Sequence, residues 1–118
     1  MARLSIRIDL LPEGRLGPGK VTLLERIAEH GSIAAAGRSL RMSYRRAWEL
    51  VAETAKLLGG PVVKAQTGGR HGGKATLTPL GEEVVRRYRA AESQAAQAAS
   101  RELDALQRAA DKARKQVN

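Results

Sequence analysis

The sequence contains no cysteine and no phenylalanine, and only 3% of its 118 residues are aromatic. Without cysteine the chain forms neither a disulfide framework nor a thiolate metal site, and its two histidines, His30 and His71, lie far apart in sequence. The scarcity of aromatic side chains leaves Leu, Ile, Val and Ala to build a modest core. We therefore expect one small domain without metal or other cofactor, which a partner subunit would help to stabilise.

Long apolar runs are also missing. No segment approaches the roughly 18 consecutive apolar residues of a membrane-spanning helix, and the N-terminus lacks the apolar core of a signal peptide. The sequence offers no Ser, His and Asp constellation, no cysteine nucleophile and no pair of carboxylates within an apolar segment. These absences predict a cytoplasmic protein that is not an enzyme and does not bind a membrane.

Positive charge is what the chain has in excess. Lys and Arg together number 21 against 12 Asp and Glu, which gives a formal net charge of +9, and the sequence pI is near 10.8. A domain with this charge is suited to a polyanionic partner such as double-stranded DNA.

The first 31 residues predict a strand and then a helix. Apolar and polar side chains alternate over residues 4–10, which is typical of a half-buried strand. Prolines and glycines then interrupt the chain: Pro12, Gly14, Gly17, Pro18 and Gly19. From Lys20 the apolar residues follow helical spacing, with Val21, Leu24, Ile27 and Ala28 on one stripe. We expect this helix to end near His30 and Gly31.

Residues 32–58 hold two short helical patterns separated by a tight polar turn, which is typical of a helix-turn-helix. Ser32 and Ser43 are placed to cap the N-termini of the two helices. The first helix is rich in alanine over residues 34–36, and small side chains permit close approach of the second helix. Apolar residues of the second helix recur on one face, which we expect to lie on the core: Tyr44, Ala47, Trp48, Val51, Ala55 and Leu58.

The opposite face of the second helix is the candidate for contact with DNA: Ser43, Arg45, Arg46, Glu49, Glu53 and Lys56. Arg45 and Arg46 lie in the first turn, where positive charge opposes the helix dipole and adds no stability. A guanidinium there can instead donate two parallel hydrogen bonds to guanine, or hold a phosphate. The alternative is that both are solvated charges paired with Glu49 or Glu53.

The two aromatic residues of this helix have different expected roles. Trp48 lies on the apolar stripe, which favours a core residue over a platform for base stacking. Tyr44 lies in the first turn, from which its hydroxyl could reach a phosphate while its ring packs inward.

Two short apolar segments, 62–65 and 75–78, flank a glycine-rich, basic tip. This pattern predicts a β-hairpin that follows the helix-turn-helix as a wing. Arg70, His71 and Lys74 would supply positive charge for phosphates or for the minor groove. A surface hairpin with incidental charge is the alternative.

The rest of the chain predicts a continuous helix of about 50 Å. It begins at Thr78, a further N-cap candidate, and contains neither proline nor glycine after Gly81. A narrow apolar stripe along which a second copy can pack is formed by Val84, Tyr88, Ala91, Ala95, Leu103, Leu106, Ala110, Ala113 and Val117. A solvated tail beyond about Ser100 is the alternative. The predicted fold is therefore mainly α with a small β-hairpin: a winged helix-turn-helix over residues 1–78, and a long C-terminal dimerisation helix over residues 79–118.

The segment GSIAAAGRSLRMSYRRAWELV, followed by TGGRHGGKATLTPLGEEVVRRY, resembles the winged helix-turn-helix domain of ModE-type molybdate-responsive transcription regulators, a relative of the LysR-type DNA-binding domain. The resemblance runs from about Leu16 to Tyr88 and rests on MSYRRAW and on the glycine-rich wing that ends in LT-x-x-G. It implies a homodimer that binds a palindromic operator, with the second helix in the major groove and the wing alongside. By matching position, it implies that these residues contact DNA: Ser43, Tyr44, Arg45 and Arg46, with Arg70 and Lys74 in the wing.

Full-length ModE proteins carry C-terminal molybdate-binding domains, whereas this chain ends at Asn118 after one predicted helix. Molybdate binding by this chain is therefore doubtful, which favours a stand-alone DNA-binding version. The expected function is that of a sequence-specific transcriptional regulator. The alternative is a basic architectural protein that binds nucleic acid without sequence preference. Affinity distinguishes the two, because a sequence-specific dimer prefers its site over random duplex by about a thousandfold or more.

Overall fold

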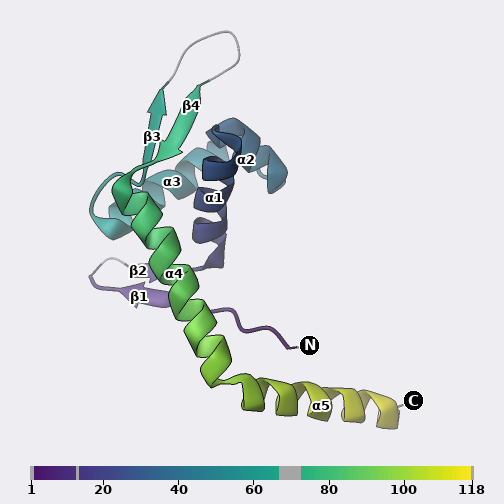
Figure 1. The fold of residues 1–118 in the computed structure, drawn as a ribbon. Coiled ribbons are helices and arrows are strands. Elements are labelled where there is room, and N and C mark those ends of the chain that lie inside the picture. The colour runs from purple at the N-terminus through teal and green to yellow at the C-terminus, as the bar shows by residue number, and fades with distance from the viewer. Residues whose placement is uncertain (1, 13, 67–72, 118) are drawn as a thin grey trace.

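The computed structural model describes residues 2–12, 14–66 and 73–117, and in these ranges five helices and two antiparallel β-hairpins follow one another (Figure 1). The elements in chain order are β1 (Ile8–Leu10), β2 (Gly14–Leu16), α1 (Pro18–His30), α2 (Ile33–Ser39), α3 (Tyr44–Leu58), β3 (Val63–Gln66), β4 (Lys74–Leu77), α4 (Pro79–Ala98) and α5 (Ser100–Val117). The prediction of a mainly helical winged helix-turn-helix is confirmed.

The N-terminal strand is shorter than predicted and forms one arm of a hairpin. Side-chain burial alternates from Leu4 to Leu10 as expected, but only Ile8–Leu10 pair with a second strand, Gly14–Leu16. The prediction treated Gly14 as a chain breaker. Instead it opens β2 with a φ of 139°, a conformation that glycine adopts without steric cost.

Helix α1 begins at Pro18, two residues before the predicted start, and ends where it was expected. Gly31 takes a left-handed φ of 69°, and its N–H donates to the Ile27 carbonyl at 2.8 Å. Ala28 was expected on the apolar stripe but is exposed. Leu23, which the predicted stripe omitted, is buried instead.

Both serine caps of the helix-turn-helix are present. The Ala35 N–H donates to Ser32 Oγ at 3.1 Å at the start of α2, and the Arg46 N–H donates to Ser43 Oγ at 3.0 Å at the start of α3. Because each hydroxyl satisfies an N–H that the helix itself leaves unpaired, the sequence fixes where both helices begin.

One core joins the helices to the two hairpins. Its buried members are Leu16, Val21, Leu23, Leu24, Ile27, Ile33, Ala36, Ala47, Val51, Val62, Ala75, Val84 and Tyr88. The core draws on α1, α2, α3, β2, β4 and α4, so the helix-turn-helix is held from several sides.

The predicted wing is confirmed as β3 and β4, with Val63 opposite Leu77. The Ala75 N–H donates to the Gly31 carbonyl at 2.8 Å, which ties the wing to the end of α1.

Thr78 fixes the first turn of α4 against the chain that precedes β3. Its Oγ1 accepts a hydrogen bond from the Gly81 N–H at 3.0 Å and donates one to the Pro61 carbonyl at 2.7 Å. A Cβ on Gly81 would overlap the Val62 carbonyl oxygen. The glycine is therefore required by the close approach of α4 to this backbone.

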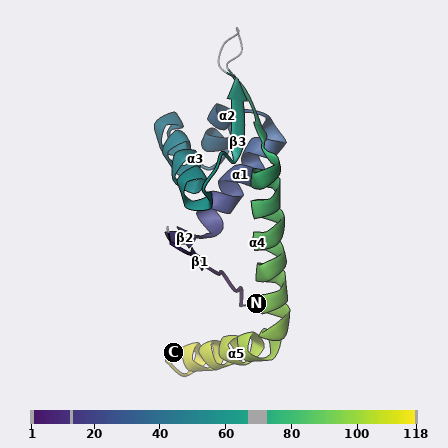
Figure 2. The same cartoon turned by 90° about the vertical axis from the view of Figure 1, so that its left-hand side faces the viewer.

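The C-terminal region is not the single helix that we predicted. The helix is interrupted at Ala99, with φ −96° and ψ 5°, and α5 turns sharply away from α4 (Figures 1 and 2). The side chains at residues 95, 96, 98 and 99 are all alanine, so helix propensity by itself favours a straight continuation. The bend brings Leu103 to a cavity of about 530 Å³ that Ala2 and Leu4 also line. No helix in the described ranges is long and apolar enough to cross a membrane.

Tyr88 anchors α4 to the N-terminal segment. The side chain is 1% exposed, and its hydroxyl donates to the Ile6 carbonyl at 2.7 Å. Burial raises the pKa of the Tyr88 phenol above its ordinary value, and the nearby Glu92 carboxylate adds to the rise, while Arg89 opposes it.

Arg89 joins α4 to α1. Its Nε and Nη2 donate to the two carboxylate oxygens of Glu25 at 3.1 and 2.7 Å, and its Nη1 donates to Glu92 at 2.9 Å. The hydrogen bonds to Glu25 raise the pKa of the Arg89 guanidinium, although partial burial opposes this rise. The contacts of Gly81, Tyr88 and Arg89 together join α4 to the rest of the domain. We call this junction the α4 seam and define it by Gly81, Tyr88, Arg89, Glu25 and Glu92.

Candidate nucleic-acid interface

The turn between α2 and α3 brings the two helices close together. The N–H groups of Leu40 and Met42 both donate to the Gly37 carbonyl at 3.0 Å. A Cβ on Gly37 would lie 3.2 Å from the Cβ of Ala47 on α3. The close approach that we predicted from the alanines of α2 thus occurs at Gly37, where the missing side chain sets the spacing of the helices.

Two charged side chains in the first turn of α3 point into solvent. The side chain of Arg45 is 90% exposed and that of Arg46 is 50% exposed. Arg45 Nε donates to Glu49 Oε1 at 3.2 Å, and Arg46 Nη1 donates to Glu49 Oε2 at 3.4 Å and to Glu53 Oε1 at 3.5 Å. Both arginines therefore make the intrahelical pairs that we considered as an alternative. Such exposed pairs contribute only about 0 to 1 kcal/mol and open readily to a polyanion.

Tyr44 does not pack inward as the apolar stripe predicted. It is 55% exposed, whereas Ala47 in the same turn is fully buried. The core therefore covers Ala47 but not Tyr44. Its ring meets Trp48 edge-on, with centroids 6.0 Å apart and planes at 75°. Trp48 is partly buried and packs against the core, as predicted. Tyr44 consequently remains more than half exposed at the start of α3.

The structure brings five of the predicted site residues together at the start of α3, and we call this surface the reading face: Ser43, Tyr44, Arg45, Arg46 and Glu49. Lys74 is exposed at the first position of β4. Arg70 and His71, also predicted to contact DNA, lie outside the described residues. The wing and α5 lie at opposite ends of the molecule (Figures 1 and 2).

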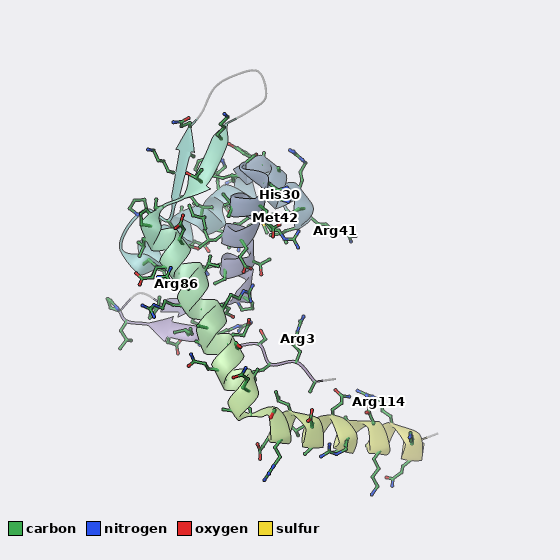
Figure 3. The ribbon with its side chains drawn as sticks, viewed as in Figure 1. Arg3, His30, Arg41, Met42, Arg86 and Arg114 are labelled. Atoms are coloured by element: carbon green, nitrogen blue, oxygen red, sulfur yellow. The ribbon has the colours of Figure 1, made fainter. Side chains whose placement is uncertain are left out.

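Two exposed basic residues of α2 and of the turn that follows it were not predicted as site residues. Arg38 lies in the last turn of α2 and Arg41 lies in the turn that follows, and both are exposed. Arg41 has a left-handed φ of 57°, which an arginine adopts only when the surrounding turn requires it. Figure 3 places Arg41 at the outer end of the helix-turn-helix, beside Met42.

The chemistry of this surface is that of cationic and hydrogen-bonding groups on a rigid support. Guanidinium groups, two hydroxyls and an ammonium group are exposed on or near the helix-turn-helix. Among the described residues, no three His, Asp or Glu side chains gather into a possible metal site. The arrangement is suited to binding phosphates and the edges of bases.

The family comparison agrees with this geometry. Residues 19–82 match the model of the bacterial regulatory helix-turn-helix proteins of the lysR family. The match spans α1 to the first turn of α4 and so includes the helix-turn-helix and both strands of the wing.

Curated relatives confirm the resemblance to ModE-type regulators. The molybdenum-pterin-binding protein MopB of Rhodobacter capsulatus is 46% identical over 79 residues, 67% of this chain and 29% of its own length. The molybdenum transport protein ModE of Azotobacter vinelandii is 36% identical over 92 residues, 78% of this chain and 33% of its own. The DNA-binding transcriptional dual regulator ModE of Escherichia coli is 35% identical over 71 residues, 60% and 27%. The chain thus spans a third or less of the length of these relatives.

A solved structure is similar as well. The crystal structure of the CbnR DNA-binding domain with DNA is 20% identical, with a TM-score of 0.48, and the alignment covers 85% of this chain and 97% of that one. The family match assigns a regulatory role rather than an enzymatic one, as the sequence predicted. This chain belongs to the bacterial regulatory helix-turn-helix proteins of the LysR family.

Proposed function

We propose that the chain is a DNA-binding transcriptional regulator of the ModE type that recognises a specific sequence with the reading face. The observation that carries this proposal is the exposed pair Arg45 and Arg46 at the capped start of α3. A helix that begins at a fixed cap presents its first turn in one orientation, as base recognition in the major groove requires. Such a regulator acts in the cytoplasm.

The members of the reading face take different roles in this proposal. Arg45 and Arg46 donate hydrogen bonds to guanine or to a phosphate, while the hydroxyls of Ser43 and Tyr44 reach the sugar-phosphate backbone of DNA. Lys74, with Arg70 and His71 of the wing tip, contacts phosphates beside the groove. No molybdate site is assigned to this chain, because the molybdenum in the relatives' names belongs to proteins of which it matches a third or less.

Replacement of the arginines tests the proposal. A duplex is first selected from a random pool with the wild-type chain, and its affinity is compared with that of a random duplex of equal length. Arg45→Ala and Arg46→Ala should each weaken binding to the selected duplex by about 1 to 3 kcal/mol if the side chain reads a base. Arg87→Ala, an exposed arginine on α4 that also pairs with a glutamate, is the matched control.

Two results would contradict this assignment. If both α3 variants bind like the wild type, the reading face does not contact DNA. If the wild type itself shows no preference for the selected duplex, the chain is an architectural protein that binds by charge.

The wing has its own test. Each phosphate contact contributes about 0.9 to the slope of log affinity against log salt, so Arg70→Ala with Lys74→Ala should make that slope shallower by up to about 1.8. The control removes the same charge from α5, at the other end of the molecule, with Lys112→Ala and Lys115→Ala. Equal slopes in the two double variants would show that the hairpin points away from DNA.

We further propose that residues 79–118 join two copies into a homodimer on a palindromic operator. Leu106 is 66% exposed on α5, and two motifs are needed to span half-sites about 34 Å apart or a multiple of this distance. Leu106→Asp should loosen the dimer and weaken operator binding, whereas Ala105→Asp on an adjacent face should not. Light scattering decides the matter, since a 12.7 kDa particle with full operator affinity would exclude the dimer.

A further inference from the structure

Glu49 bridges the two arginines of the reading face with one carboxylate oxygen for each. Its Oε1 accepts from Arg45 Nε at 3.2 Å and its Oε2 accepts from Arg46 Nη1 at 3.4 Å. The Glu49 side chain is 46% exposed, so the carboxylate lies at the same surface that is proposed to meet DNA. Glu49 therefore restrains the orientation of both guanidinium groups and lowers the net positive charge of the cluster that the three side chains form.

The bridge uses a particular edge of Arg45. The hydrogen bond to Glu49 is made through Nε, and within the described residues no acceptor is bonded to the terminal amino groups of Arg45. A guanidinium held at Nε keeps its outer edge free, and that edge donates two parallel hydrogen bonds to O6 and N7 of guanine. Glu49 therefore limits how Arg45 can swing without blocking the donors that read a base.

The charge of Glu49 acts against one of the two possible partners of the arginines. A phosphate is an anion, so a carboxylate a few ångströms from each guanidinium repels it, whereas the acceptor atoms of guanine are uncharged. Lys and Arg bound to phosphates supply most of the affinity for DNA of any sequence. A carboxylate at this position consequently weakens non-specific binding more than it weakens base recognition.

From these contacts we infer that Glu49 is a positioning residue for sequence discrimination: it holds Arg45 toward bases and disfavours the capture of Arg45 and Arg46 by phosphates. This inference rests on the proposed function and adds a role to it. Glu49 acts through the arginines and not by contact with a base of its own.

The chain contains a matched control for this arrangement. On α4, Glu83 Oε2 lies 3.7 Å from Arg86 Nη2 and 3.5 Å from Arg87 Nε, so a single glutamate again pairs with two consecutive arginines. These side chains are exposed, as on α3. Figure 3 shows Arg86 on α4, away from the Arg41 and Met42 turn that leads into α3. Glu83→Gln therefore makes the same change of charge away from the reading face.

The experiment compares Glu49→Gln and Glu83→Gln with the wild type on two duplexes, the selected duplex and a random duplex of equal length. Glu49→Gln should bind the random duplex more tightly and with a salt slope steeper by about 0.9 for each phosphate gained. The ratio of specific to random affinity should fall by roughly tenfold, the size of one bidentate base contact. Glu83→Gln should leave the ratio unchanged to within about twofold.

A second background tests whether Glu49 acts through the arginines. When Arg45 and Arg46 are both alanine, Glu49→Gln should no longer change the ratio. A persistent loss of preference at one base pair in that background would show that Glu49 contacts a base itself, and the inference would be wrong. An unchanged ratio for Glu49→Gln in the wild-type background would also overturn it. A wild-type chain without any preference would instead refute the proposed function, on which the inference depends.

Discussion

The reading face and the α4 seam are both built from arginine and glutamate, but they connect different parts of the chain. On the reading face, Arg45 and Arg46 pair with glutamates three to seven positions away on the same helix. In the α4 seam, Arg89 pairs with Glu25, which lies 64 positions earlier. The Arg45 side chain is 90% exposed and the Arg89 side chain is 33% exposed.

This difference separates groups that are available for binding from groups that hold the fold. An exposed pair within one helix gives up little when it opens, because water and salt already screen it. A partly buried pair between two helices makes several charge-assisted hydrogen bonds at once, so its loss leaves polar groups without partners. We therefore expect substitutions in the α4 seam to alter stability, and substitutions on the reading face to alter binding.

Gly81→Ala should have the largest effect on the free energy of unfolding. The new Cβ would overlap the Val62 carbonyl oxygen, and a backbone group cannot move aside as a flexible side chain can. We expect a loss of about 3 kcal/mol or more, measured by urea unfolding. Gly19→Ala is the control, since nothing lies within 4 Å of its added Cβ. Comparable stability of the two variants would mean that α4 is free to shift away from Val62.

Arg89→Ala should have the next largest effect, since it removes the hydrogen bonds to Glu25 and Glu92. We expect a loss of about 2 kcal/mol, less than for a fully buried pair because solvent reaches these side chains. Arg87→Ala, whose side chain is 74% exposed and pairs with Glu83, should change the free energy of unfolding by less than about 0.5 kcal/mol. Equal losses in the free energy of unfolding for Arg89→Ala and Arg87→Ala would contradict the distinction between the α4 seam and exposed pairs.

Tyr88→Phe should cost about 1 kcal/mol, because the Ile6 carbonyl loses its donor. It should also change the response to alkali. Since burial raises the pKa of the folded-state phenol above 10.0, the unfolded state ionises first. Wild-type stability is then intact below about pH 10 and falls as the pH rises toward the folded-state pKa. Urea unfolding at about pH 8 and about pH 11 should show a steeper loss for the wild type than for Tyr88→Phe. Parallel losses would place the phenol in solvent.

The smallest effect on stability is expected from Arg45→Ala with Arg46→Ala. Their pairs with Glu49 are exposed, and positive charge in a first turn opposes the helix dipole, so thermal unfolding should shift by less than about 0.5 kcal/mol in free energy. Ser43→Ala in the same turn should cost about 1 kcal/mol, since it removes the N-cap. A double arginine variant less stable than Ser43→Ala would assign these arginines to the fold.

Local features of this chain were predictable because neighbouring residues determine them. The N-caps at Ser32, Ser43 and Thr78 and the glycine end of α1 follow from single side chains beside a helical pattern. The wing followed from two apolar segments around a glycine-rich tip. The reading face was predictable for the same reason, since four of its residues are consecutive.

The errors fall where a distant part of the chain, or the edge of the core, decides the outcome. Tyr44 fits the helical spacing of the apolar stripe, but the core reaches α3 at Ala47 and does not cover Tyr44. The stripe after α4 also continues at helical spacing, and nothing in that pattern shows a bend at Ala99. The second strand of the N-terminal hairpin was missed because Gly14 and its neighbours are typical of a loop.

The class of the molecule could be derived from the sequence: a basic, mainly helical winged helix-turn-helix whose charged first turn of α3 faces solvent. Charge, capping and periodicity act over a few residues, so they can be analysed without coordinates. Only the folded chain shows that Arg89 bonds Glu25, that Tyr88 bonds the Ile6 carbonyl and that α5 turns away from α4. These contacts depend on which surfaces meet in the folded chain, and residues far apart in sequence leave no local pattern that specifies such a meeting.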